Sequence, residues 1–225
     1  MKNSKTKKAL YWLLDLGLNI IVILGLVIII QTWIIAPFDV SGKSMCDTLN
    51  NINGECVNGY GEKIIINEVL YLFSEPKKGD IVVFKIPKEN KSDEKYYIKR
   101  IIGEPGDTVK IENGEVYLKE KGKEEFIKLK ENYLNGTNKG NTKTYFDGLN
   151  TYEVPENKYF VMGDNRNSST DSRSCFASTI NSECKNDISK SFIDREIIRG
   201  KASLVFWPIT KIRLLDGHIY EELAN

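Results

Sequence analysis

The feature that most constrains this fold is a long apolar stretch near the N-terminus. From Gly17 to Ala36 the sequence has no charged residue and consists mainly of Ile, Leu and Val. About 20 helical residues, at ~1.5 Å each, match the ~30 Å hydrocarbon core of a bilayer. Four lysines precede the stretch, at Lys2, Lys5, Lys7 and Lys8. Because positive charge stays on the cytoplasmic side, the sequence predicts a single transmembrane helix with its N-terminus inside and the rest of the chain outside.

A cleaved secretory signal is the main alternative to an anchor. The apolar stretch is longer than a normal signal core, and Ala36 is followed by Pro37, which makes a poor cleavage site. A buried core helix is disfavoured by the unbroken apolar length. We therefore expect an uncleaved anchor that divides the chain into three parts: a cytoplasmic basic tail at 1–9, a transmembrane anchor at 10–36 and an extracytoplasmic domain at 37–225.

The remaining chain is predicted to be mainly β. Its 225 residues allow one domain of ordinary size beside the anchor, and a net charge of +1 argues against a nucleic-acid binder. Short runs of β-branched and aromatic residues predict strands at 63–66, 81–86, 96–102, 109–112, 115–118, 159–162 and 202–207. Asn113-Gly114 predicts a hairpin turn, and a short helix is expected at 68–73. The polar segment 118–155 is interpreted as a surface insertion, or as an ordinary long loop with a hairpin.

Three polar segments of the predicted domain carry chemistry. They are Ser41-Gly42-Lys43-Ser44-Met45, then Tyr97-Ile98-Lys99-Arg100 ahead of Gly103-Glu104-Pro105-Gly106-Asp107, then the run from Gly163 to Arg173. A serine nucleophile needs a base to take its proton. The only histidine, His218, lies seven residues from the C-terminus without a partner motif and is interpreted as a surface residue. A lysine is therefore the better candidate base.

Lys99 has a sequence setting that suits this role. It lies within an apolar, strand-like run, and burial among apolar groups lowers the pKa of a lysine by favouring its neutral form. Strand alternation places Lys99 on the same face as Tyr97 and Ile101. Arg100 then points to the opposite face and stays charged. Ser44 follows the anchor by about eight residues, after Gly42, which permits a tight backbone approach.

The order and spacing of these segments resemble the bacterial type I signal peptidases. The resemblance covers the anchor and most of the domain, but not 119–154, which in that family is a variable cap to which we assign no chemistry. It implies a membrane-bound serine endopeptidase that cleaves N-terminal signal peptides from exported preproteins without a metal or cofactor. Ser44 would be the nucleophile and Lys99 the general base. The implied partners are signal peptides and membrane lipids, and a monomer is expected.

The resemblance also assigns supporting and substrate-binding residues. Ser169 would hold the lysine amine, while Asp171 pairs with Arg173 and Asp164 with Arg100. The backbone N–H of Ser44 would supply one donor to the oxyanion. Shallow pockets would exclude large side chains from the first and third positions before the cut, at −1 and −3. The residues that resemble the pocket lining are Phe38, Val40, Gly42, Met45, Leu49, Tyr97 and Ile98. Apolar residues near Pro37 and Trp207-Pro208 are expected to touch lipid.

The sequence departs from the family pattern at three positions. Asp47 replaces a proline and places a negative charge near the site, where it would raise the Lys99 pKa. Gly42 stands where some members carry a hydroxyl that serves as a second oxyanion donor. Asn167 stands where many members carry Asp. These departures leave open a catalytically impaired homologue that acts as an anchored peptide- or protein-binding module.

Other enzyme classes fit the residues less well. A sortase-like transpeptidase needs a catalytic Cys with His and Arg partners, and the single C-terminal His makes it weak. Autoproteases of the repressor type also use a Ser/Lys dyad, but they lack a membrane anchor and carry a DNA-binding module, which this chain does not show. The endoplasmic-reticulum relatives use His where Lys99 stands, which favours a bacterial-type enzyme.

Four cysteines are compatible with disulfides in an extracytoplasmic domain. Three pairings are possible, and proximity in the sequence favours Cys46–Cys56 and Cys175–Cys184. The first pair would brace the loop that carries Ser44. A zinc site is disfavoured because the spacing lacks Cys-x-x-Cys units.

Overall fold

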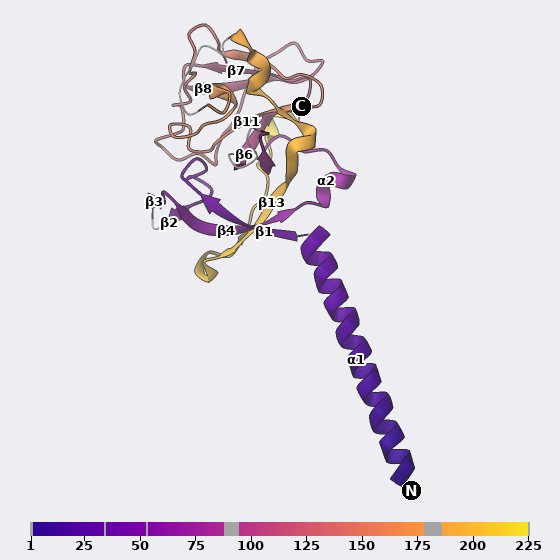
Figure 1. Ribbon diagram of the computed structural model, residues 1–225. Coiled ribbons are helices and arrows are strands. Elements are labelled where there is room, and N and C mark those ends of the chain that lie inside the picture. The colour runs from indigo at the N-terminus through magenta and orange to yellow at the C-terminus, as the bar shows by residue number, and fades with distance from the viewer. Residues whose placement is uncertain (1, 34, 53, 88–94, 178–185, 225) are drawn as a thin grey trace.

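A single long helix projects from a β-rich body. The computed structural model describes residues 2–33, 35–52, 54–87, 95–177 and 186–224. Helix α1 (Lys2–Trp33) extends as a straight rod from one end of the body, and the C-terminus lies within the body (Figure 1). The prediction of a mainly β domain is confirmed. Within the described residues, no helix meets the length and hydropathy expected of a membrane span.

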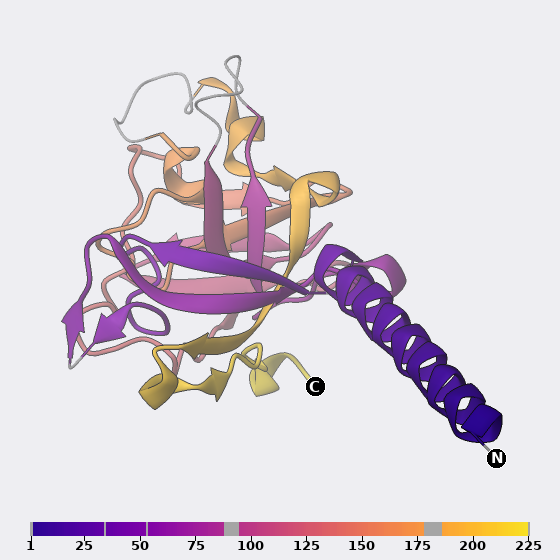
Figure 2. The same cartoon turned by 60° about the horizontal axis from the view of Figure 1, so that its bottom comes forward.

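One large antiparallel sheet forms the half of the body next to α1. Its strand order is β1, β4, β13, β5, β6, β11 and β12, and β14 pairs with β13. Strand β1 follows α1 directly and forms the outer edge, where it pairs only with β4; the two run side by side in Figure 2. The strand bounds are β1 (Ile35–Ser41), β4 (Tyr60–Asn67), β5 (Ile81–Lys85), β6 (Tyr96–Gly103), β11 (Lys158–Met162), β12 (Ile193–Asp194), β13 (Ile198–Trp207) and β14 (Arg213–Leu214).

Apolar clusters cover both faces of this sheet at β5. Ile81 and Val83 pack in a cluster with Val40, Met45 and residues of β4. Their neighbours Val82 and Phe84 belong to a different cluster, because side chains alternate between faces along a strand. A strand covered on both faces has a continuous apolar run in its sequence, as residues 81–84 of β5 do.

A second sheet forms the far half of the body. Its order is β10 (Thr151–Glu153), β7 (Thr108–Glu112), β8 (Glu115–Lys119) and β9 (Ile127–Lys128). Strands β7 and β8 form the predicted hairpin, and its turn residues Asn113 and Gly114 have φ angles of 52° and 81°. Two of the four strands, β9 and β10, come from the predicted insertion 118–155. The insertion therefore packs into the body, and its Leu129 and Tyr152 belong to the core.

Every predicted strand is present, but three elements differ clearly from their predicted length, among them β4, which spans Tyr60–Asn67 where 63–66 was predicted. The predicted helix 68–73 is the single turn α2 (Leu70–Phe73), because Pro76 disfavours helical backbone before it and the chain is extended at Ser74. Strand β13 begins at Ile198, four residues before the predicted start. The first part of this strand could not be predicted because it contains Arg199, Gly200 and Lys201, and glycine and charged residues are uncommon in strands.

The disulfide between Cys46 and Cys56 is confirmed. It joins the segment after β1 to β3 (Glu55–Cys56), which pairs with β2 (Asn51–Ile52). Cys184 lies outside the described residues, so its pairing with Cys175 stays a prediction.

Candidate active site

Ser44 and Lys99 lie in direct contact. The Lys99 Nζ donates to Ser44 Oγ at 2.7 Å and to the Ile98 carbonyl at 2.9 Å. Lys99 comes from the middle of β6, opposite Val82, and is only 3% exposed. Ser44 lies three residues beyond β1, after a turn in which Gly42 has a φ of +83° that side chains disfavour. The two residues predicted to react together are therefore brought together by two strands of the same sheet.

Burial changes the protonation of Lys99. Loss of hydration lowers the pKa of its amine to about 8. The carboxylates of Asp171 and Asp164 oppose this shift, and the Arg173 charge adds to it. Roughly a tenth of the amine is then neutral at pH 7, which is enough for a general base.

The expectation that Asp47 raises the Lys99 pKa is wrong. Asp47 is not among the charges that shift that pKa. Its Oδ2 accepts instead from the backbone N–H of Asn135 at 2.8 Å and from Asn138 Nδ2 at 3.0 Å. Both donors belong to the insertion, so this carboxylate is directed away from the amine.

The turn at Gly163 holds the backbone of the nucleophile. The Asn165 N–H donates to the Ser44 carbonyl, and Asn165 Nδ2 donates to the Lys43 carbonyl, both at 3.0 Å. A Cβ atom at Gly163 would lie 2.4 Å from the Ser44 carbonyl oxygen, so only glycine permits this approach. Asn165 belongs to the polar segment from Gly163 to Arg173, but no role was predicted for it. Its place directly after Gly163-Asp164 is the sequence signal that could have identified it as a residue that holds the Ser44 backbone.

Both predicted ion pairs are formed, and both are buried. Arg100 Nε and Nη2 donate to the two carboxylate oxygens of Asp164 at 2.9 and 2.7 Å. Arg173 Nε and Nη2 donate to Asp171 in the same way, at 2.9 and 2.8 Å. Asp171 loses hydration on burial, yet the facing Arg173 guanidinium holds its pKa below the usual value. The paired side chains are almost fully buried, so loss of one partner would leave an uncompensated charge.

The predicted hydrogen bond between Ser169 and Lys99 is absent. The buried Ser169 Oγ makes no hydrogen bond to the Lys99 amine and faces the Asp171 carboxylate instead, whose pKa it helps to lower. It lies against Gly163, where a Cβ would come within 2.3 Å of it. The Lys99 amine is directed to Ser44 and Ile98 instead.

The insertion reaches the same polar network. Arg166 pairs with Glu131 in a buried contact and also donates to the Tyr133 hydroxyl at 3.1 Å. The Arg100 guanidinium lies 3.9 Å from the centre of the Tyr133 ring. The insertion, to which the sequence assigned no chemistry, therefore supplies side chains to the polar network beside the site. Nothing in the sequence marked Glu131 or Tyr133, because neither belongs to a motif.

An open groove of about 700 Å³ runs along the edge strand β1 and ends at Ser44 and Lys99. It is lined by six of the seven predicted substrate-binding residues, namely Phe38, Val40, Gly42, Met45, Tyr97 and Ile98. Leu49 is the exception. It is fully buried in the core beside Ile64, because it lies one turn beyond Met45 and points into the sheet.

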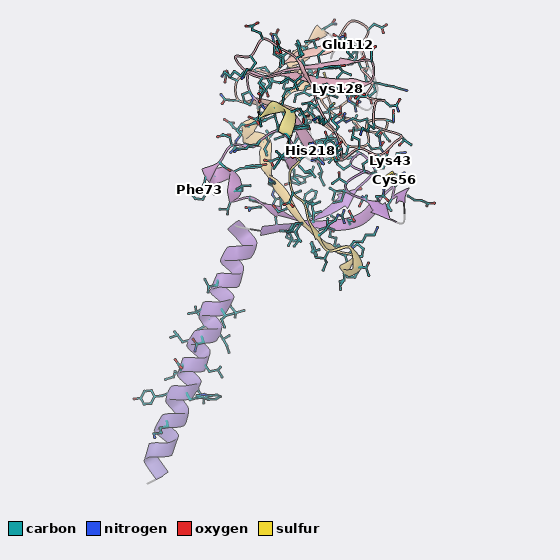
Figure 3. All side chains as sticks on the ribbon, turned by 180° about the vertical axis from the view of Figure 1, so that it is seen from behind. Lys43, Cys56, Phe73, Glu112, Lys128 and His218 are labelled. Atoms are coloured by element: carbon teal, nitrogen blue, oxygen red, sulfur yellow. A yellow bond between two sulfur atoms is a disulfide. The ribbon has the colours of Figure 1, made fainter. Side chains whose placement is uncertain are left out.

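The groove lining also includes residues that were not predicted from the sequence, namely Lys43, Lys95, Tyr96, Ser168 and Thr170. Lys43 and Cys56 lie together on the side of the body away from Phe73 (Figure 3).

His218 packs against residues of the body away from the groove. Its Nε2 lies 2.9 Å from the Lys130 carbonyl oxygen, and its ring packs edge-on against Tyr133 and Tyr220. It does not line the groove. In the described part of the chain, no three His, Cys, Asp or Glu side chains are grouped as metal ligands.

The chain is similar to known peptidases along most of its length. The family model for signal peptidase, peptidase S26, matches residues 13–207. Signal peptidase I S of Bacillus subtilis (strain 168) is 33% identical over 214 residues, which cover 93% of this chain and 95% of that protein. Signal peptidase IB of Staphylococcus aureus (strain COL) is 30% identical over 220 residues, covering 92% and 94%. A crystal structure of a signal peptidase I from Enterococcus faecalis V583 matches with 25% identity and a TM-score of 0.37, over 58% of this chain and 98% of that chain.

These matches define the class as a peptidase. The chain belongs to the signal peptidase family, peptidase S26. The prediction of a hydrolase of the signal peptidase I type is confirmed at the level of the family.

Proposed function

We propose that this chain is a membrane-anchored serine endopeptidase that removes N-terminal signal peptides from exported preproteins, with Ser44 as nucleophile and Lys99 as general base. The observation that carries the proposal is the 2.7 Å contact between the buried Lys99 amine and the Ser44 hydroxyl. Family membership supports the substrate class, since the relatives described above are named signal peptidase I.

The chemistry follows from this contact. Ser44 Oγ attacks the scissile carbonyl carbon while the neutral Lys99 amine takes the hydroxyl proton. The C–N bond then breaks, Lys99 returns the proton to the leaving amine, and the acyl group stays on Ser44. Water attacks the ester as Lys99 takes its proton, which releases the signal peptide as a carboxylate and restores Ser44. The Ser44 backbone N–H supplies one donor to the developing oxyanion.

The groove supports a preference for small residues at −1 and −3. Close to Ser44 and Lys99 it is lined by Val40, Met45 and Ile98, which are buried and already in contact with the core. Side chains fixed in this way cannot move aside for a bulky residue, so they select by exclusion. We propose Ala as the residue that fits both positions.

The proposed anchor is α1, with its N-terminus in the cytoplasm and the peptidase domain outside. Apolar side chains are exposed along the described part of the helix, for example Ile21 at 68% and Leu24 at 55%. The uncharged stretch and the preceding lysines support this orientation. Exposed Trp207 and Ile209, at 47% and 69%, support a contact of the body with lipid. We propose a monomer that acts on signal peptides.

Cleavage of a model preprotein in detergent or liposomes tests the proposed dyad. The substrate carries Ala at −1 and −3. Wild type should cut at the predicted bond, whereas folded Ser44→Ala and Lys99→Ala should not. Lys123→Ala is the matched control, since it removes an exposed lysine that does not line the groove. Full activity in Lys99→Ala would exclude the dyad, and a folded but inactive wild type would favour the impaired, peptide-binding homologue.

A further inference from the structure

One asparagine of the insertion bridges the two loops that form the site. Asn138 Nδ2 donates to Asp47 Oδ2 at 3.0 Å. On its other side, Asn138 Oδ1 accepts from the backbone N–H and the Nδ2 of Asn167, at 3.2 and 3.1 Å. Asp47 lies three residues after Ser44, and Asn167 lies within the Gly163–Arg173 loop. Asn138 is only 2% exposed, although its own segment forms the surface of the body.

Asp47 depends on the insertion for its position. Its Oδ1 is buried without a hydrogen-bond partner among the described residues. The hydrogen bonds of its carboxylate are the two that Oδ2 accepts, from Asn138 and from the backbone of Asn135. A half-buried carboxylate with so few donors is costly to place. Loss of the Asn138 amide would therefore leave this carboxylate with the Asn135 backbone N–H as its remaining donor and would loosen its position.

The turn that carries Asn138 is itself fixed. The side-chain oxygen of Asn135 accepts from the backbone N–H groups of Thr137 and Asn138, at 3.0 and 3.2 Å. An asparagine that bonds to the backbone ahead of it stabilises a turn without other support. The Asn138 amide thus enters the site from a preformed element.

Both bridged loops hold Ser44. The backbone N–H groups of Asp47 and Thr48 donate to the Met45 carbonyl, at 2.8 and 2.9 Å, so a movement of Asp47 is passed to the residue beside Ser44. Asn165, two residues before Asn167, donates to the Ser44 carbonyl. The bridge therefore fixes the separation of the two loops that place Ser44 against Lys99.

We propose that Asn138 is a positioning residue for the proposed peptidase reaction, acting through Asp47 and Asn167. It does not line the groove, so it has no contact with substrate. The inference rests on the proposed function, so the test starts from a preparation in which wild type cleaves the model preprotein and Ser44→Ala does not. If wild type does not cleave the model preprotein at that step, the result contradicts the proposed Ser44–Lys99 dyad and not the proposed role of Asn138.

The first variant is Asn138→Ala. We expect kcat to fall by about tenfold with KM unchanged, since small displacements of reacting groups cost large factors in rate. Asn141→Ala is the control, because Asn141 is exposed in the same turn and bonds only within it, to the carbonyls of Thr137 and Lys139. The assay is run well below the unfolding temperature of each variant, where a merely stabilising role leaves kcat unchanged. A folded Asn138→Ala enzyme with the kcat of wild type would overturn the proposal.

A second, independent test exchanges the asparagine at position 138 and the aspartate at position 47. Asn138→Asp places a carboxylate against Asp47 and should be at least as impaired as Asn138→Ala. Adding Asp47→Asn restores a bond between the two side chains with donor and acceptor exchanged, and position 138 still accepts from Asn167, but the Asn135 backbone N–H, which Asp47 Oδ2 also accepts, loses its acceptor. We therefore expect the double variant to be clearly faster than Asn138→Asp but slower than wild type, because only the bond between positions 47 and 138 is restored. A double variant no faster than Asn138→Asp would refute the bridge, even if Asn138→Ala fails to fold.

Discussion

The surroundings of Lys99 have two opposing effects on the pKa of its amine. Burial removes the hydration that keeps a lysine protonated, while the nearby Asp171 and Asp164 favour the charged form. Burial is the larger effect, and the resulting pKa of about 8 lies below the ordinary value of 10.5. The proposed mechanism therefore needs no separate base, since the burial that accompanies the contact with Ser44 also leaves part of the amine deprotonated, and so able to accept a proton, near neutral pH.

The pH dependence of cleavage follows from this pKa. Only the neutral amine accepts the Ser44 proton, so kcat/KM should rise as the pH rises through about 8 and level off above it. Because the folded state binds this proton less tightly than the unfolded chain, the stability contributed at Lys99 also rises from pH 8 towards 10.5. Rates measured between about pH 6 and 10 test the first statement. Lys99→Arg is the control, since it keeps the charge and should be inactive throughout, and a wild-type profile without a rise near pH 8 would contradict the assignment.

Residues with local sequence signals were predictable. Ser44 and Lys99 follow from short motifs and from alternation along β6, while both ion pairs were implied by the family resemblance. The structure brings the members of each pair together. Glu131 was not predictable, because its partner Arg166 is 35 residues away and the segment between them has no pattern. The expected contact of Ser169 with Lys99 rested on the family resemblance, and in the structure this hydroxyl lies beside Gly163 and Asp171.

At the scale of elements, the segment that carries Ser44 belongs to no strand or helix and needs other restraints. The Cys46–Cys56 disulfide fixes it to β3, and Asp164 accepts from Thr48 at 2.5 Å. The insertion adds the contact to Asp47. In the family pattern a proline stands where this chain has Asp47. We infer that cross-links to other elements replace the local stiffness of that proline.

Loss of this disulfide should affect both stability and rate. Closing a loop of ten residues contributes about 3 kcal/mol in the chain-entropy model, so Cys46→Ser with Cys56→Ser should lower the free energy of unfolding by about that amount. A looser nucleophile segment should also reduce kcat. Denaturant unfolding and cleavage rates measure the two effects. Because Cys56 is exposed, a mild reductant should impair wild type similarly and leave the double variant unchanged; a further loss in the double variant would assign the effect to other cysteines.

Strand elements were predicted better than their connections. Alternation and continuous apolar runs are local, and each predicted strand is found. The insertion has polar composition, yet Leu129 and Tyr152 are buried against residues of the second sheet. Such packing depends on partners distant in the chain, so the polar composition of the insertion did not indicate which of its residues are buried.

The whole molecule places the groove close to the proposed anchor. Helix α1 ends at Trp33 and β1 begins at Ile35, so the edge strand that lines the groove continues almost directly from the helix. Phe73 lies beside the same end of α1 (Figure 3) and is 86% exposed. Strand β1 leads from this end of α1 to Ser44, which lies three residues beyond the end of the strand.

Charges placed within α1 test whether it anchors the molecule. Ile21→Lys with Leu24→Lys puts two charges near the middle of the uncharged stretch, where each costs about 2.5–3.5 kcal/mol to insert. We expect wild type to stay with lipid vesicles after a high-salt and alkaline wash, and this variant to be released. Tyr11→Lys with Leu14→Lys is the matched control, because it adds the same charges at the same spacing beside the basic tail, where they remain near the headgroups. Cleavage of a short soluble substrate should be unchanged in both variants, since the groove residues are untouched. If the Ile21/Leu24 variant resists the wash as firmly as wild type, the body rather than α1 holds the enzyme to the membrane.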